Sequence, residues 1–230
     1  TLFTSILQVL NLAELGVGNA MVYSMYKPIA DDDKSKIQKL MNLYKRYYRI
    51  IGTIILLAGL VIIPILPQLI KDDFPEGINL NVIYIITLLT TVLSYWLFSF
   101  RTSLLVAHQR NDVHTKIQLI VFAIQYTLQI VSLSVFRNYY IFLLIALVAQ
   151  LLNNILVRIV TNRMYPNYMP EGVLELGERK KINRKIRDLF TAKLGGTVTN
   201  SADTVVISAF LGLTILAKYN NYYYILMALF

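Results

Sequence analysis

The sequence contains no cysteine, only two histidines and few charged residues. The missing cysteines exclude a disulfide framework, a cysteine-ligated zinc site, an iron–sulfur cluster and a thiol nucleophile. His108 and His114 alone leave little for a metal site. Charged residues make up 15% of the chain, whereas ordinary soluble domains carry about 25%. A soluble core of this length could not bury so much apolar surface, so we expect the chain to lie in a membrane.

Signatures of common enzymes are missing as well. The stretch 16–18 reads Gly-Val-Gly but is not followed by Gly-Lys-Ser, and the chain has no His-Glu-x-x-His or Gly-x-Ser-x-Gly motif. Three aspartates at 31–33 resemble a divalent-metal motif. Their lysine neighbours and their place at a predicted helix start indicate a helix N-cap instead. We therefore expect no enzyme activity, no bound metal and no cofactor.

The chain is rich in long apolar runs, and 56% of its residues are hydrophobic. A membrane span needs about 20 predominantly apolar residues. The runs that meet or approach this length are 2–25, 50–70, 78–100, 117–136, 139–157, 194–216 and 219–230. They are too long for barrel strands, which predicts an all-α, polytopic transmembrane helix bundle with these seven helices. Pro64 and Pro67 are expected to end the second helix. Because both chain ends fall inside apolar runs, we expect a piece of a longer protein.

Basic residues alternate between the connections of these spans, and they account for the net charge of +9. The connections 27–49, 101–116 and 158–193 hold 19 of the 22 lysines and arginines, and the intervening connections hold one each. Lysine and arginine concentrate on the cytoplasmic side of membrane proteins. The three basic connections are therefore predicted to be cytoplasmic, and nucleic-acid binding is not needed to explain the charge.

Polar residues recur on one face of five spans, at the three- and four-residue spacing of a helix. The stripes are Thr4, Gln8, Asn11, Glu14 and Gly18; Thr87, Thr91, Ser94, Phe98, Arg101 and His108; Gln118, Gln125, Gln129 and Ser132; Gln150, Asn154 and Arg158; and Lys193, Gly196, Thr197, Asn200, Asp203 and Thr204. Such side chains can join packed helices, each bond contributing roughly 1 kcal/mol. Five stripes together favour a second hypothesis, a shared polar cavity in the bundle.

Two acidic residues inside the predicted spans indicate a functional site more specifically than the polar stripes do. Glu14 and Asp203 lie inside predicted spans, where an acid costs about 2.5–3.5 kcal/mol and usually faces a cavity, pairs with a base or carries ions. A protonated carboxyl bonded to a neighbouring helix is the alternative. Arg101, Lys193 and Arg158 either snorkel to the cytoplasmic surface or face the cavity. The residues predicted for a substrate or ion pathway are Asp203, Glu14, Asn200, Arg101, Lys193, Gln125 and Asn11.

A basic, amphipathic stretch follows the fifth span. Residues 171–188 combine Val173, Leu174, Leu176, Ile182 and Ile186 with six lysines and arginines. This pattern predicts a helix on the anionic inner leaflet of the membrane. A basic connection that only sets topology would explain most of the same residues.

Three stretches resemble a known family. They are Asn11-Leu-Ala-Glu-Leu-Gly-Val-Gly-Asn-Ala-Met, Ser103-Leu-Leu-Val-Ala-His-Gln-Arg-Asn, and Asn200-Ser-Ala-Asp-Thr-Val-Val-Ile-Ser-Ala-Phe-Leu-Gly. The chain is similar over nearly its whole length to polysaccharide-biosynthesis flippases, of the O-antigen and capsule exporter type, in the multidrug/oligosaccharidyl-lipid/polysaccharide exporter superfamily. The resemblance implies a two-lobe fold, with residues 1–160 as a first lobe lacking its first helix, 161–190 as a cytoplasmic linker and 191–230 as the start of a second lobe.

The resemblance also implies an activity. Family members move undecaprenyl-pyrophosphate-linked oligosaccharides across the bacterial cytoplasmic membrane by alternating access. Expected partners are this lipid-linked oligosaccharide, membrane lipids, and polysaccharide polymerase and assembly proteins, with no nucleic acid. Two alternatives stay open: an H⁺- or Na⁺-coupled drug/cation antiporter of the same superfamily, and a membrane-embedded polysaccharide polymerase or glycosyltransferase. The short external connections, 71–77 and 137–138, argue against the second.

Overall fold

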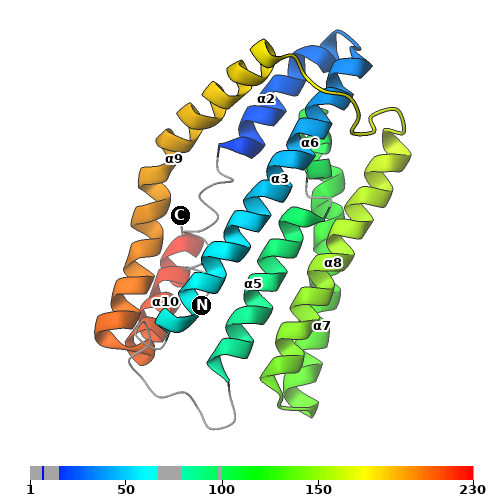
Figure 1. Cartoon of the computed structure of the whole chain (residues 1–230). Helices are drawn as coiled ribbons and strands as arrows, with labels where there is room; N and C mark the ends of the chain where they lie inside the picture. The colour runs from blue at the N-terminus through cyan, green and yellow to red at the C-terminus, as the bar shows by residue number, and fades with distance from the viewer. Residues whose placement is uncertain (1–6, 8–15, 67–78, 98–99, 230) are drawn as a thin grey trace.

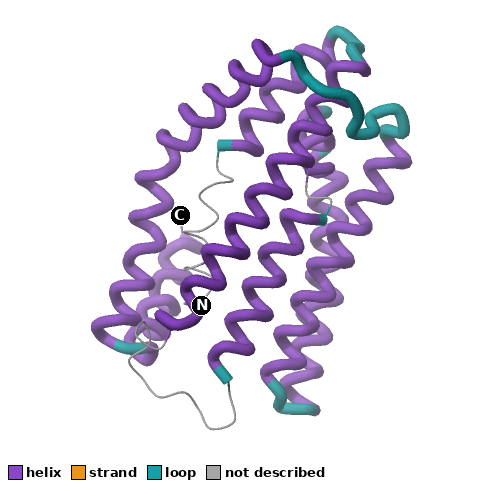
Figure 2. Tube along the Cα trace, viewed as in Figure 1, coloured by secondary structure: helices purple, strands orange, loops and turns teal. Residues whose placement is uncertain are grey.

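All regular structure in the described part of the chain is helical, which confirms the predicted all-α class (Figures 1 and 2). The computed structural model describes residue 7 and residues 16–66, 79–97 and 100–229. The elements are α2 (Val17–Ala30), α3 (Lys34–Ile62), the 3₁₀ turn η2 (Ile63–Ile65), α5 (Leu80–Trp96), α6 (Phe100–Ala107), α7 (Asn111–Val135), α8 (Tyr139–Met164), α9 (Leu176–Leu211) and α10 (Leu213–Leu229).

Short polar side chains start several of these helices. The Asp33 carboxylate accepts a hydrogen bond from the Lys36 backbone N–H at 2.9 Å, so the predicted N-cap in the triple-aspartate stretch is confirmed. Asn79 and Asn138 cap α5 and α8 in the same way. At the other end of α3, the α-helix stops at Ile62 and Pro64 lies in the 3₁₀ turn, as expected for a residue without a backbone N–H. Pro67 lies outside the described residues.

Membrane-spanning character is clearest in two helices. By length and composition, α7 and α8 can each cross a membrane, and α5 with α6 counts as a third span if this pair, bent by 52°, is one unit. The predicted amphipathic helix and the sixth predicted span merge into the single helix α9, which runs from Leu176 to Leu211. Gly212 then breaks the chain direction at a φ of 86°, a conformation that favours glycine. The chain is a helical membrane bundle.

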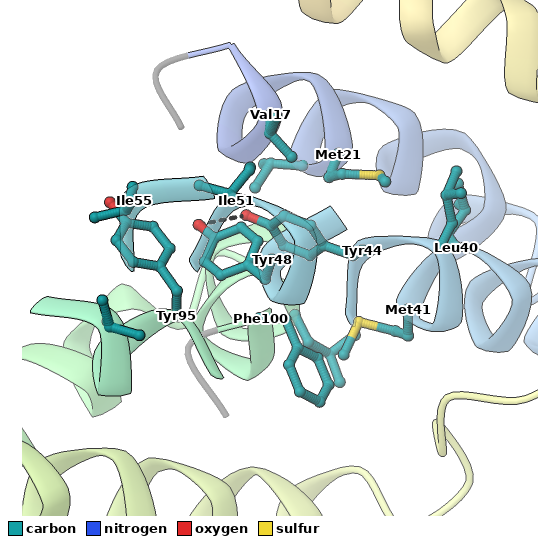
Figure 3. Packing of buried hydrophobic residues seen from close by; sticks show 14 of the residues in the cluster. Val17, Met21, Leu40, Met41, Tyr44, Tyr48, Ile51, Ile55, Tyr95 and Phe100 are labelled. Atoms are coloured by element: carbon teal, nitrogen blue, oxygen red, sulfur yellow. Dashed lines mark hydrogen bonds between the residues drawn. The ribbon is translucent and has the colours of Figure 1, made fainter. Parts of the chain in front are cut away.

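Helix packing brings the amino-terminal half of the chain together around α3. Helix α5 packs between α3 and α8, α7 pairs with α8, and α2 contacts α3, α6 and α9 (Figure 1). The buried core between α2, α3 and α5 includes Met21, Tyr44, Tyr48 and Tyr95 (Figure 3). Gly59 lets α5 approach α3 closely, because a Cβ there would lie 2.5 Å from the Leu88 side chain.

Candidate functional site

Arg101 is the most deeply buried charged side chain among the predicted site residues whose side chains the structure describes. It lies on α6 with 4% of its surface exposed, and its guanidinium stands 5.5 Å from the centre of the Phe100 ring. Its Nη1 donates a hydrogen bond to the Tyr168 carbonyl at 3.2 Å, and its Nη2 lies 3.3 Å from the Met169 sulfur. Arg101 therefore does not snorkel to the surface, and its bonds hold the segment after α8 against α6.

Positive charge extends from Arg101 toward the surface. The half-buried Lys45 on α3 has a lowered pKa, first because of burial and then because of the charges of Arg49, Arg101 and Arg158. In the part of the chain that the structure describes, neither Lys45 nor Arg101 has a carboxylate within ion-pair distance. A cation is costly to bury without a counter-charge. We call Lys45, Arg49, Arg101 and Arg158 the cationic cluster, and its charge arrangement suits an anionic ligand.

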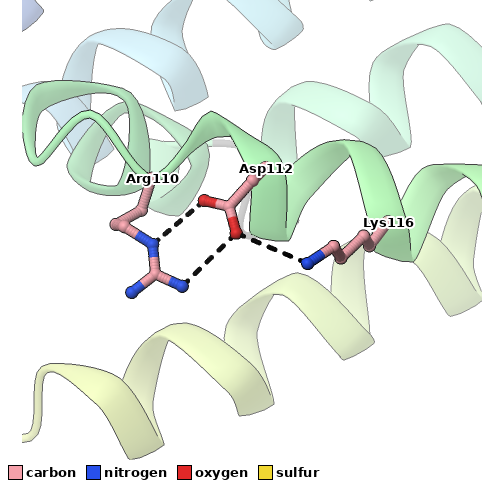
Figure 4. Close-up of polar contacts among 3 residues, drawn as sticks. All are labelled: Arg110, Asp112 and Lys116. Atoms are coloured by element: carbon pink, nitrogen blue, oxygen red, sulfur yellow. Dashed lines mark hydrogen bonds and ion pairs between the residues drawn. The ribbon is translucent and has the colours of Figure 1, made fainter.

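Charges at the nearby turn between α6 and α7 are paired, in contrast. The Arg110 guanidinium donates to both Asp112 carboxylate oxygens, at 2.9 and 3.3 Å. The Lys116 Nζ lies 3.7 Å from the same carboxylate, one helical turn further on (Figure 4). All three side chains are largely exposed, so these ion pairs contribute little to stability. Unlike Arg110 and Lys116, Lys45 and Arg101 have no carboxylate within ion-pair distance in the described part of the chain.

A chain of buried hydroxyls links α6 to α3. Ser103 donates to the Tyr44 hydroxyl at 2.8 Å, and Tyr44 donates to the Tyr48 hydroxyl at 3.1 Å (Figure 3). The predicted stripe on the same side of α5 behaves differently. The hydroxyls of Thr87, Thr91 and Ser94 bond to backbone carbonyls of their own helix.

The polar stripe of α7 joins helices, as the first of the two hypotheses states. Gln129 is 4% exposed, and its amide donates to the Phe142 carbonyl of α8 at 3.1 Å. Gln125 lies 3.5 Å from the Gln129 side chain and lines an apolar groove of about 240 Å³ between α7 and α8. The other lining residues are Val121, Ile124, Leu128, Ile141, Leu144, Ile145, Val148, Ala149 and Leu152.

Asp203 is exposed in the described part of the molecule, and it lies apart from the cationic cluster. The Tyr219 hydroxyl of α10 donates to its carboxylate at 3.2 Å, while the adjacent Thr204 and the nearby Ser208 are the buried polar residues of this part of α9. Glu14 and Asn11 lie outside the described residues, as do the side chains of Lys193 and Asn200. Among the predicted site residues whose side chains are described, Gln125 lines the groove between α7 and α8, whereas Arg101 and Asp203 do not.

Several residues with clear structural roles were not among the predictions. The basic connection 27–49 contains Tyr44, Lys45 and Tyr47, and its sequence was interpreted only as a topology signal. The aromatic residues spaced three and four apart, beginning at Tyr44, could have indicated a buried helix face. The partners of Tyr47 on α9, Asn183 and Arg179, could not be inferred because they lie more than 130 residues away.

Comparisons with known proteins give one match. The family model of the polysaccharide biosynthesis protein family matches residues 2–230. No curated protein and no solved structure matches the chain significantly. The family match covers nearly the entire sequence and agrees with the resemblance carried by the three stretches at 11–21, 103–111 and 200–212. The chain belongs to the polysaccharide biosynthesis protein family.

Proposed function

We propose that the protein moves a lipid-linked oligosaccharide, of the undecaprenyl-pyrophosphate type, from the inner to the outer leaflet of a bacterial cytoplasmic membrane. Membership of the polysaccharide biosynthesis family supports a role in making or exporting polysaccharide. The apolar helices support a membrane location. In this proposal the protein is a transporter and not an enzyme, and its O-antigen or capsule polymerase and assembly proteins act beside it.

The observation that carries the proposal is the cationic cluster. Arg101 is buried and Lys45 is half-buried, and neither has a carboxylate within ion-pair distance in the described part of the chain. The charge of Arg101 is one of those that lower the pKa of Lys45. A pyrophosphate group carries the negative charge that these cations lack. Binding it would relieve their mutual repulsion, so the ligand and the cluster are electrostatically complementary.

A deletion strain tests the transport role directly. Without the protein, we expect lipid-linked repeat units to accumulate on the cytoplasmic face of the membrane and surface polysaccharide to be lost. Normal surface polysaccharide in the deletion strain would contradict the proposal.

Substitutions in the deletion strain test the cluster. Arg101→Gln should lower the rate of surface-polysaccharide formation several-fold, because the buried charge of Arg101 adds to the positive potential by which the cluster attracts a pyrophosphate. Arg101→Lys, which keeps the charge, should retain part of the activity. Lys116→Gln, a change of equal charge at an exposed position, is the control and should be neutral. Immunoblots of membranes must show equal protein, and equal activity of Arg101→Gln and Lys116→Gln would remove the cluster from the mechanism.

A further inference from the structure

A groove between α3 and α9 joins two pockets that the transport proposal does not use. The pockets measure about 260 and 510 Å³, and they share Tyr47, Ile50 and Arg179 as lining residues. Tyr47 connects the two helices by donating to the Asn183 side chain at 2.5 Å. We call these two adjoining pockets together the interfacial groove.

One end of the interfacial groove is cationic. Lys39 and Arg46 from α3 and Arg179 from α9 line the smaller pocket, and no acidic residue lines either pocket. Within the described ranges, none of these three side chains is in an ion pair. The Arg179 Nε lies 3.4 Å from the Tyr47 hydroxyl, which holds the guanidinium at the junction of the two pockets.

The other end of the groove is mostly apolar. Val17, Ile51, Ile186 and Phe190 line the larger pocket, together with Asn183 and Arg187. The Arg187 guanidinium is ion-paired with the Asp188 carboxylate at 3.7 Å. Ile50, at the boundary, has 55% of its surface exposed. Along the helices, the groove therefore changes from an end with three cations outside any described ion pair to an end with mostly apolar side chains, where the additional cation, Arg187, is paired with Asp188. This is the polarity profile of a phospholipid head group followed by its acyl chain.

A neighbouring pocket shows that this charge imbalance is specific. The pocket of about 380 Å³ between α2, α3 and α9 has both signs of charge along its lining. Its charged residues are Lys27, Lys36, Lys181, Lys185, Asp31, Asp33 and Glu178. Lys36 and Glu178 are ion-paired there, and the hydrogen bond between them raises the pKa of Lys36. This mixed pocket therefore has three acids against its four lysines, whereas no acid lines the interfacial groove.

We propose that the interfacial groove binds an anionic membrane phospholipid. Its phosphate lies against Lys39, Arg46 and Arg179, and one acyl chain lies along Ile51, Ile186 and Phe190. The cytoplasmic leaflet carries anionic lipids, and basic pockets between membrane helices recognise their head groups. The lipid would bridge α3 to α9. This inference stands on the groove alone and does not depend on the transport proposal.

Native mass spectrometry of the purified protein with phosphatidylglycerol and phosphatidylcholine tests the inference. We expect phosphatidylglycerol to bind more tightly, and the double variant Arg46→Gln/Arg179→Gln to weaken its affinity about 30-fold, since each interfacial cation contributes roughly fivefold. The matched control, Lys181→Gln/Lys185→Gln, removes the same charge from the mixed pocket and should leave the affinity unchanged. Arg46→Lys/Arg179→Lys should retain most binding, which separates loss of charge from misfolding.

Two further binding measurements, one with a short-chain lipid and one with a competitor, complete the test. Phosphatidylglycerol with six-carbon chains should bind more weakly than the long-chain lipid, because it leaves the trough around Phe190 partly empty. Equal affinity for phosphatidylglycerol and phosphatidylcholine would overturn the proposal, as would equal weakening in the control variant. Displacement of the long-chain lipid by inorganic pyrophosphate alone would assign the groove to free phosphate compounds, and would also overturn it.

Discussion

Lys45 is a half-buried cation that lies among other cations. Its pKa is lowered by burial and by three neighbouring guanidinium groups, so protonated Lys45 destabilises the folded state. This penalty is present at neutral pH and disappears as the pH rises through the lowered pKa of the folded protein toward the ordinary value of 10.5. We therefore expect the cationic cluster to lower the stability of the folded protein while it serves the function.

We expect Lys45→Gln to raise the free energy of unfolding by about 0.5–1 kcal/mol at pH 7. Thermal unfolding in detergent measures this change, and the advantage of the variant should shrink as the pH rises toward 10.5. Lys34→Gln is the control, since Lys34 is exposed and lies 3.6 Å from the Asp32 carboxylate. A variant less stable than the wild-type protein would show that Lys45 has a compensating partner.

Substitutions at Asp203 and Tyr219 can distinguish the role of the negative charge of Asp203 from the role of its hydrogen bond. Asp203→Asn keeps an oxygen that can accept the Tyr219 hydrogen bond and removes the negative charge. If Asp203 serves the predicted substrate or ion pathway, this variant should insert normally and transport several-fold more slowly. Tyr219→Phe removes only the hydrogen bond and is the matched comparison. Wild-type transport by Asp203→Asn would exclude the carboxylate from the pathway.

The contact between α2 and α9 depends on one glycine at its closest point. A Cβ on Gly16 would lie 2.3 Å from the Ile186 carbonyl oxygen and 3.0 Å from the Phe190 nitrogen. These are backbone atoms, so neither can move aside alone. Helices α2 and α9 must therefore move apart to accept any residue larger than glycine at position 16.

Gly16→Ala is therefore expected to lower the free energy of unfolding by about 1–3 kcal/mol, the usual cost of overpacking. Gly177→Ala is the control on α9, because a Cβ there has no neighbour within 4 Å, and alanine favours a helix by up to about 1 kcal/mol over glycine. Thermal melts of the two variants should move in opposite directions. Equal losses would mean that α9 is not held closely against α2.

The sequence predicted the helices better than their partners. Asp33 and Pro64 act within a few residues of themselves, so their roles as cap and terminator follow from local chemistry. Gln129 was placed correctly on a polar face, but its bond to the Phe142 carbonyl depends on how α7 pairs with α8. Arg101 likewise meets Tyr168, 67 residues later, through tertiary packing that no spacing rule contains.

At the scale of the whole molecule, the basic segments gather at one end. The turn between α2 and α3 and the segment between α8 and α9 lie at one end of the bundle, and the α7–α8 and α9–α10 turns lie at the other (Figure 1). Helix α9 has 36 residues, about 54 Å at 1.5 Å per residue, whereas the hydrocarbon core is about 30 Å thick. Its basic amino-terminal end can therefore extend beyond the membrane on the predicted cytoplasmic side.

Introduced cysteines can test this orientation without background, because the chain has no thiol of its own. Four exposed positions serve as probes, two in the basic segments (Lys34→Cys, Arg184→Cys) and two at the opposite end (Arg137→Cys, Lys218→Cys). A membrane-impermeant maleimide should label the second pair in intact cells, and the first pair only after the cells are opened. Labelling of Lys34→Cys in intact cells, with Arg137→Cys protected, would invert the topology. The cationic cluster would then face outward, so inner-leaflet capture of a pyrophosphate lipid would be untenable.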